Sequence, residues 1–124
     1  MPYFTYDTSV LISRRLTDSS AMPHGFLMSA VVQLELMANA QDESRRKFHE
    51  QAFHRYRKAD LLIVPNVDDR LLASTILYLL THDRKRAHKG KLKRLPPGAS
   101  KRLALDVLIA VSARRWKAQI VTEN

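Results

Sequence analysis

Short apolar runs alternate with longer helical patterns along this chain. The first run, residues 3–12, is rich in aromatic and β-branched side chains and passes from a strand pattern directly into helix signals at Thr8 and Ser9. Three further strands are predicted at residues 26–28, 61–64 and 119–122. Because parallel strands are joined by crossover helices, the alternation predicts an α/β fold with a central parallel sheet between helical layers.

The helical segments follow the strands in turn. Helices are expected to continue the first strand to residue 16 and to cover residues 30–40, 41–60, 70–80 and 102–115. Ser29 is the expected N-cap of the second helix, and Asp68 or Asp69 that of the fourth. The nearly unbroken apolar content of residues 70–80 predicts close packing, whereas residues 81–98 are expected to form a surface loop or a frayed helical end.

Three acidic residues stand out against their surroundings. Asp7 directly follows the first strand, and open parallel sheets bind their ligands at the carboxyl ends of their strands. Glu35 and Asp106 each interrupt an apolar helical window that is expected to be buried on most sides, where an ionised carboxylate costs several kcal/mol unless a positive group meets it. One interpretation is that each acid pairs with an arginine or lysine or lies on an exposed stripe. A shared cation explains all three together, and hard oxygen ligands favour Mg²⁺ or Mn²⁺.

Length and charge narrow the class of protein. A chain of 124 residues with 45% hydrophobic and 27% charged residues is expected to form a single domain over residues 1–124. Lysine and arginine number 21 against 12 acidic residues, which gives a formal net charge of +9. The first partner to consider is therefore a polyanion such as nucleic acid. An acidic protein partner, or a surface that is merely basic, is the alternative interpretation.

The sequence lacks cysteine and a long uninterrupted apolar run, which excludes cysteine-based chemistry and a membrane span. The sequence has no cysteine, which excludes disulfides, thiolate metal sites and a cysteine nucleophile and fits a cytoplasmic protein. The longest apolar run, residues 71–80, is interrupted by Ser74 and Thr75, so no membrane span is expected.

The positive charge is densest within residues 81–98. Several cations near an acidic cleft are able to track an RNA backbone, although a solvated charge run is the alternative interpretation. The residues predicted to contact RNA are Arg84, Lys85, Arg86, Lys89, Lys91, Lys93 and Arg94.

Four motifs occur in an order that resembles a known family. They are DTSVLI at 7–12, VVQLELMA at 31–38, LDVLIAVSA at 105–113 and IVTEN at 120–124. Together they resemble the PIN-domain ribonucleases, in particular the VapC-like toxins of bacterial toxin–antitoxin pairs, over essentially the whole chain. The resemblance implies a PIN-like three-layer α/β/α sandwich and a Mg²⁺-dependent endoribonuclease that hydrolyses RNA phosphodiester bonds.

The resemblance also implies roles for individual residues. Asp7, Glu35 and Asp106 would be the metal-binding catalytic acids, Thr8 and Thr122 would support the site through hydrogen bonds, and Asn124 would match the asparagine of the terminal motif. An antitoxin protein that inserts a basic residue into the acidic pocket, and assembly as a homodimer, are further implications.

The chain departs from the family pattern at its C-terminal end. In the family, the terminal motif continues to another acid and then to a last strand and helix, whereas this sequence stops at Asn124. We therefore expect the last strand of the sheet to be missing. Because the fourth acid is absent, the alternative hypothesis is a catalytically weak or inactive PIN module that binds RNA or a protein partner. A small basic DNA-binding regulator is a third hypothesis, disfavoured because no helix-turn-helix pair is evident.

Overall fold

The structure of the protein, a computed structural model, describes residues 2–13, 22–87 and 99–122. The elements in chain order are β1 (Phe4–Tyr6), α1 (Thr8–Ser13), β2 (Met28–Ser29), α2 (Ala30–Ala38), α3 (Glu43–Lys58), β3 (Leu62–Ile63), α4 (Val67–Ala87), α5 (Ala99–Arg115) and β4 (Gln119–Val121). The fold is therefore mixed α/β, as the alternation of short apolar runs and helical patterns predicted.

The four strands run parallel and form two hydrogen-bonded pairs. β1 pairs with β4, with Phe4 opposite Gln119, and β2 pairs with β3. A parallel bridge between Phe4 and Phe26 joins the two pairs, and Leu27 N donates to Phe4 O at 2.9 Å beside it. The strands thus follow the spatial order β3, β2, β1, β4. This order places a topological switch point between β1 and β4, which is where open parallel sheets bind ligands.

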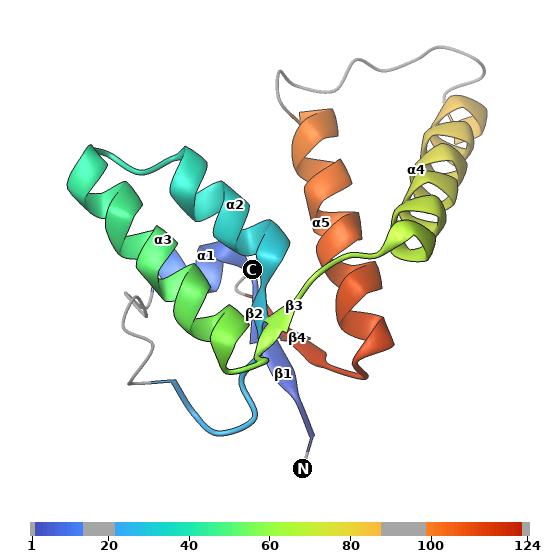
Figure 1. Cartoon of the computed structure of the whole chain (residues 1–124). Helices are drawn as coiled ribbons and strands as arrows, with labels where there is room; N and C mark the ends of the chain where they lie inside the picture. The colour runs from blue at the N-terminus through green and yellow to red at the C-terminus, as the bar shows by residue number, and fades with distance from the viewer. Residues whose placement is uncertain (1, 14–21, 88–98, 123–124) are drawn as a thin grey trace.

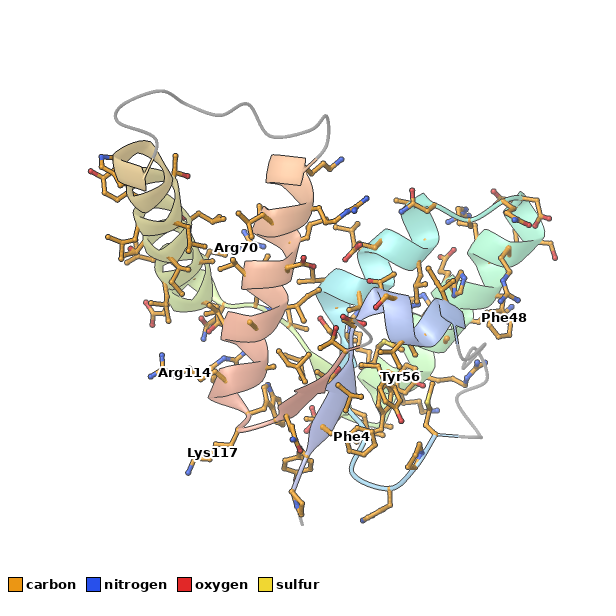
Figure 2. All side chains as sticks on the ribbon, turned by 180° about the vertical axis from the view of Figure 1, so that it is seen from behind. Phe4, Phe48, Tyr56, Arg70, Arg114 and Lys117 are labelled. Carbon is orange, nitrogen blue, oxygen red and sulfur yellow. The ribbon has the colours of Figure 1, made fainter. Side chains whose placement is uncertain are left out.

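Helices cover the strands on both sides (Figure 1), with α2 and α3 on one side and α4 and α5 on the other. The core centres on an aromatic cluster of Phe4, Tyr6, Phe26 and Tyr56, whose ring centroids lie 5.3 to 5.9 Å apart. Such pairs contribute about 0.5–1.5 kcal/mol each beyond the burial of their area. Figure 2 shows Phe4 and Tyr56 in the interior, whereas Lys117 points away from the body. The cluster anchors β1, whose end leads directly into the candidate site.

The first two helices begin with side-chain caps, one of them unexpected. Asp7 caps α1, because its Oδ1 accepts from Val10 N at 3.1 Å. The expectation that Thr8 and Ser9 cap this helix is therefore wrong, and both lie inside its first turn. Ser29 caps α2 as predicted, its hydroxyl accepting from a backbone N–H of the first turn.

α4 is longer than predicted at both ends. Asn66 caps it in place of Asp68 or Asp69: Asn66 Oδ1 accepts from Asp69 N at 2.8 Å, and Asp69 Oδ2 accepts from Asn66 N at 3.0 Å. At the other end, residues 81–87 were expected to form a surface loop or a frayed helical end, and their backbone continues the helix. Residues 88–98 lie outside the described part of the chain.

The packing expected of α4 is found on one face only. The helix packs against α5, and Ala73 is buried there. Leu71 and Tyr78 are 67% and 59% exposed, so the nearly unbroken apolar content of residues 70–80 did not reveal which face of the helix lies inside. In the part of the chain that the structure describes, no helix combines the length and apolar character needed to cross a membrane.

Candidate active site

Asp7 lies at the switch point, between the ends of β1 and β4. Its backbone N donates to Val121 O at 3.2 Å, which extends the ladder between the two strands by one step. Its Oδ1 accepts from Ser9 Oγ at 2.7 Å and from Val10 N at 3.1 Å. The strand therefore delivers this carboxylate to the carboxyl end of the sheet, as predicted, and the cap of α1 fixes its direction.

Hydrogen bonds keep Asp7 ionised. Partial burial raises the pKa of Asp7, but hydrogen bonds from the Thr122 and Ser9 hydroxyls outweigh it, together with backbone N–H groups of Ser9 and Val10. The net effect is a lowered pKa. Thr122 directly follows β4, so the ends of the neighbouring strands β1 and β4 contribute one residue each to this contact. Asp7 is consequently a carboxylate at neutral pH.

Glu35 and Asp106 come from α2 and α5, which pack against each other. Burial raises the pKa of Glu35, and the negative charges of Asp106 and Asp7 raise it further. The Thr8 hydroxyl and Arg102 act in the opposite direction. Desolvation likewise raises the pKa of Asp106, with a contribution from the charge of Asp7 and opposition from Arg102. The three acids therefore lie within electrostatic range of one another.

The two helical acids differ in exposure. Glu35 is half-buried on α2, in agreement with its apolar sequence window. Asp106 is exposed on α5, so the expectation that it is buried on most sides is wrong. α5 contacts both α4 and α2, and the side chain of Asp106 lies where neither of them covers the helix.

The alternative interpretation, in which each acid pairs with an arginine or lysine or lies on an exposed stripe, is met in part: Asp106 is exposed, but none of the three acids forms an ion pair with a described cation. The ion pairs of the described residues involve other acids, namely Glu43, Glu50 and Asp69. Arg102 opposes the raised pKa of both Glu35 and Asp106, but it forms no ion pair with either of them in the described part of the chain. The negative charge of the site is therefore only partly compensated.

The donor set matches the chemistry of a hard divalent cation. Asp7, Glu35 and Asp106 offer oxygen ligands, and Mg²⁺ characteristically fills its remaining positions with water and phosphate oxygens. Thr8 Oγ1, beside Glu35, is buried and makes no hydrogen bond of normal geometry with a described residue. Over the described residues, no three Asp, Glu or His side chains lie close enough together to form a metal-binding group. The structure thus gathers three charges without assembling them into a ligand set.

Several predicted site residues lie outside the described part of the structure. They are Asn124 and the side chains of Arg84, Lys85, Arg86, Lys89, Lys91, Lys93 and Arg94. Their roles in the terminal motif and in RNA contact stay predictions.

The sequence did not predict two features beside the acids. Arg102 lies four residues before Asp106 on α5, and this i, i+4 spacing is a signal that could have found it. A cleft of about 780 Å³ adjoins the acids between α1, α2 and α3, and Thr8 and Glu35 form part of its lining. The cleft has no sequence signal, because it depends on how α2 packs against α3.

The fold and these residues together define a mixed α/β protein with three acids gathered near the carboxyl ends of parallel strands. No protein-family model matches the chain, and no curated protein matches it. The site is therefore interpreted from the chemistry of its own residues.

Proposed function

We propose that this protein is a PIN-type endoribonuclease that hydrolyses RNA phosphodiester bonds with Mg²⁺ or Mn²⁺ held by Asp7, Glu35 and Asp106. The observation that carries the proposal is that three carboxylates from separate elements lie within electrostatic range of one another, and that desolvation together with this like charge raises the pKa of Glu35 and of Asp106. Uncompensated like charges destabilise a fold, and such perturbed groups concentrate at functional sites. The fold we propose is the PIN-like three-layer α/β/α sandwich, which the parallel strand order and the helices on both sides support.

The ionisation of each residue suggests its part in the reaction. When bound, a divalent ion supplies Lewis acidity toward water and the phosphodiester. Asp7, with its lowered pKa, offers a permanent carboxylate at neutral pH. Glu35, with its raised pKa, is better suited to accept and return a proton. The Thr122 hydroxyl stabilises the ionised form of Asp7, and the Thr8 hydroxyl lowers the pKa of Glu35.

The formal net charge of +9 supports a polyanionic substrate, since a basic surface holds phosphates that an acidic site alone would repel. RNA is the substrate that we propose. An antitoxin partner and a homodimeric assembly remain predictions from the family resemblance.

The test is cleavage of a labelled RNA by the full chain. We expect cleavage with Mg²⁺ or Mn²⁺, none in EDTA, and a loss of at least about 100-fold in Asp7→Asn. Asparagine caps helices as well as aspartate does, so this variant removes the charge and keeps the start of α1. The matched control is Asp60→Asn, which removes an exposed charge at a left-handed position (φ 59°) that asparagine tolerates. Cleavage by Asp7→Asn at the wild-type rate would overturn the proposal.

The second candidate is a catalytically weak or inactive PIN module that binds RNA or a protein. It is favoured by the lack of an assembled metal-binding group among the described residues. RNA binding without turnover at any Mg²⁺ or Mn²⁺ concentration would select it over the nuclease.

A further inference from the structure

Arg102 lies beside the acids of the candidate site. It stands four residues before Asp106 on α5, a spacing that places the two side chains on the same face of the helix, with their Cβ atoms about 5–6 Å apart. α5 packs against α2, which carries Glu35. Desolvation raises the pKa of Glu35 and of Asp106, and the positive charge of Arg102 opposes this rise in both. Arg102 therefore acts on acids from two different helices.

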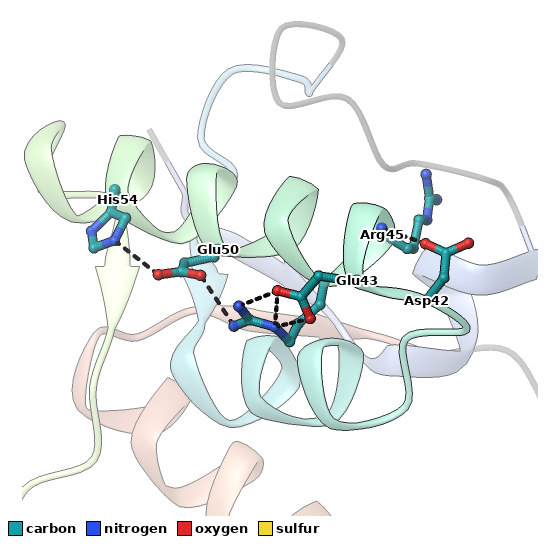
Figure 3. A network of polar contacts seen from close by, with 6 residues as sticks. Asp42, Glu43, Arg45, Glu50 and His54 are labelled. Atoms are coloured by element: carbon teal, nitrogen blue, oxygen red, sulfur yellow. Dashed lines mark hydrogen bonds and ion pairs between the residues drawn. The ribbon is translucent and has the colours of Figure 1, made fainter.

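Neither the helix nor an ion pair explains this cation. Arg102 lies in the first turn of α5, where the helix dipole disfavours positive charge. Arg46 on α3, by contrast, has carboxylate partners, Glu43 and Glu50, at 2.7 and 3.1 Å (Figure 3). Arg102 is exposed and forms no ion pair with a described residue. Other exposed arginines on the described surface also lack an ion pair, and Arg102 differs from them in its place beside the acids.

The charges of the site favour one further cation. Three ionised carboxylates carry one negative charge more than a divalent ion neutralises, so the loaded site would still repel a phosphodiester. A guanidinium beside the acids removes this excess. Its planar and permanently charged fork also matches two oxygens of a phosphate, which a lysine ammonium does not.

We propose that Arg102 is a catalytic residue: its guanidinium binds a non-bridging oxygen of the phosphodiester held at the acids and stabilises the negative charge that develops there during hydrolysis. The proposal rests on the proposed function and adds a residue to its reaction. In that reaction the oxygen of water bonds to phosphorus, one ester P–O bond breaks, and the proton that Glu35 takes from water is returned to the leaving oxygen. Donors held in place for developing charge typically contribute about 100- to 1,000-fold to kcat.

The test compares variants of the full chain in single-turnover cleavage at saturating RNA and Mg²⁺. Arg102→Met keeps the apolar stem and removes the charge, and we expect the rate to fall about 100-fold. Arg102→Lys keeps the charge without the planar fork and should recover about tenfold of this loss. Lys101→Met is the matched control, because Lys101 is an exposed cation of the same turn that lies about 100° round the helix from Arg102. Its rate should stay within about twofold of the wild type.

Two further measurements separate this role from others. The Mg²⁺ concentration at half-maximal rate should not rise in Arg102→Met, because the loss of a cation beside carboxylates favours a bound metal. Ca²⁺ takes the same kind of oxygen ligands as Mg²⁺. In Ca²⁺, fluorescence anisotropy should show that Arg102→Met binds a labelled RNA several-fold more weakly, with a slope of log affinity against log salt that is lower by about 0.7. Lys101→Met should change this affinity by less than about twofold.

Three results contradict the proposal. The first is a rate in Arg102→Met within about twofold of that in Lys101→Met. The second is recovery of the full rate in Arg102→Met at high Mg²⁺, which would make Arg102 a counter-ion of the acids only. The third is an equal loss in Arg102→Met and Arg102→Lys together with a lowered urea midpoint, which would make the role of Arg102 structural.

Failure of the proposed function looks different. If the wild type cleaves no RNA with Mg²⁺ or Mn²⁺, the nuclease is rejected and binding in Ca²⁺ decides on Arg102. A loss of affinity confined to Arg102→Met then keeps the phosphate contact, and equal affinities in Arg102→Met and Lys101→Met reject it. If the wild type and Arg102→Met cleave equally well, the nuclease stands and the role of Arg102 is rejected.

Discussion

The acids of this molecule differ in whether a positively charged side chain pairs with them. Asp69, at the start of α4, is 6% exposed. Its Oδ2 is hydrogen-bonded, because it accepts from Arg115 Nε at 3.1 Å and from Asn66 N at 3.0 Å. Arg115 in turn donates to Val64 O at 2.6 Å, which ties the end of α5 to the start of α4. This carboxylate holds two helices together.

The acids at the switch point are arranged in the opposite way. Glu35 and Asp106 have raised pKa values because partial desolvation and neighbouring negative charge disfavour their ionised forms. Neither carboxylate forms an ion pair with a described residue. A buried acid that meets a cation is explained by stability, whereas acids that repel one another require an explanation from function.

The largest expected effect tests the structural acid. Asp69→Ala removes a cap and leaves the Arg115 guanidinium and the Asn66 N–H without their acceptor. We expect the free energy of unfolding to fall by about 2–4 kcal/mol, below the upper range for buried pairs because Arg115 is partly open to solvent. Urea denaturation measures the change. In the control Asp68→Ala, an exposed neighbour is removed, and a loss below about 1 kcal/mol is expected.

The second prediction concerns an acid of the candidate site, whose replacement is expected to increase the free energy of unfolding. Because the pKa of Asp106 is raised in the folded state, its ionised form opposes folding at neutral pH. Without divalent metal at pH 7, Asp106→Asn should therefore be more stable than the wild type, by less than about 1 kcal/mol since solvent screens this exposed group. The advantage should vanish as the pH falls through the raised pKa and the wild-type residue becomes protonated.

Added Mg²⁺ should reverse this order of stability. A metal held at ten times its Kd stabilises the folded wild type by about 1.4 kcal/mol, and the Asn variant should gain less. Thermal unfolding with and without Mg²⁺ measures both differences, and Asp60→Asn should behave like the wild type. If Asp106→Asn is the less stable protein at pH 7 without metal, the contrast with Asp69 is wrong.

The local pattern of apolar and polar residues was enough to predict the order of strands and helices and the position of Asp7 at the end of the first strand. A strand followed at once by a helix places its junction at the end of a parallel sheet, and Asp7 stands at that junction. The second strand was predicted at residues 26–28 but is assigned to Met28 and Ser29. The segment pairs with two neighbours in succession, with β1 at Phe26 and with β3 from Met28 on, and pattern alone does not say where one pairing ends.

What the sequence could not supply is the relation between helices. The apolar window around Asp106 suggested burial, but the exposure of this residue depends on where α4 and α2 touch α5. The same holds for the cleft, whose shape depends on the angle between α2 and α3. Gln33 is an example: its Nε2 donates to His49 O across these helices, a contact that no spacing in the chain indicates.

The smallest expected effect concerns a basic side chain, His49, whose ionised form is also disfavoured in the folded protein. His49 is buried on α3, and burial lowers its pKa, with the nearby charge of Arg45 adding to the effect. The unfolded chain therefore takes up a proton near the usual pKa of about 6.5, before the folded protein does. The contribution to stability is intact above this pH and is lost as the pH falls toward the lowered pKa. From pH 7 to pH 5 we expect the free energy of unfolding to fall by a contribution from this residue, which His49→Gln should abolish and Arg45→Met should reduce. Denaturation across this pH range measures it, with the exposed His54→Gln as control. An unchanged pH dependence in His49→Gln would contradict the lowering of the pKa of His49 by burial and by the charge of Arg45.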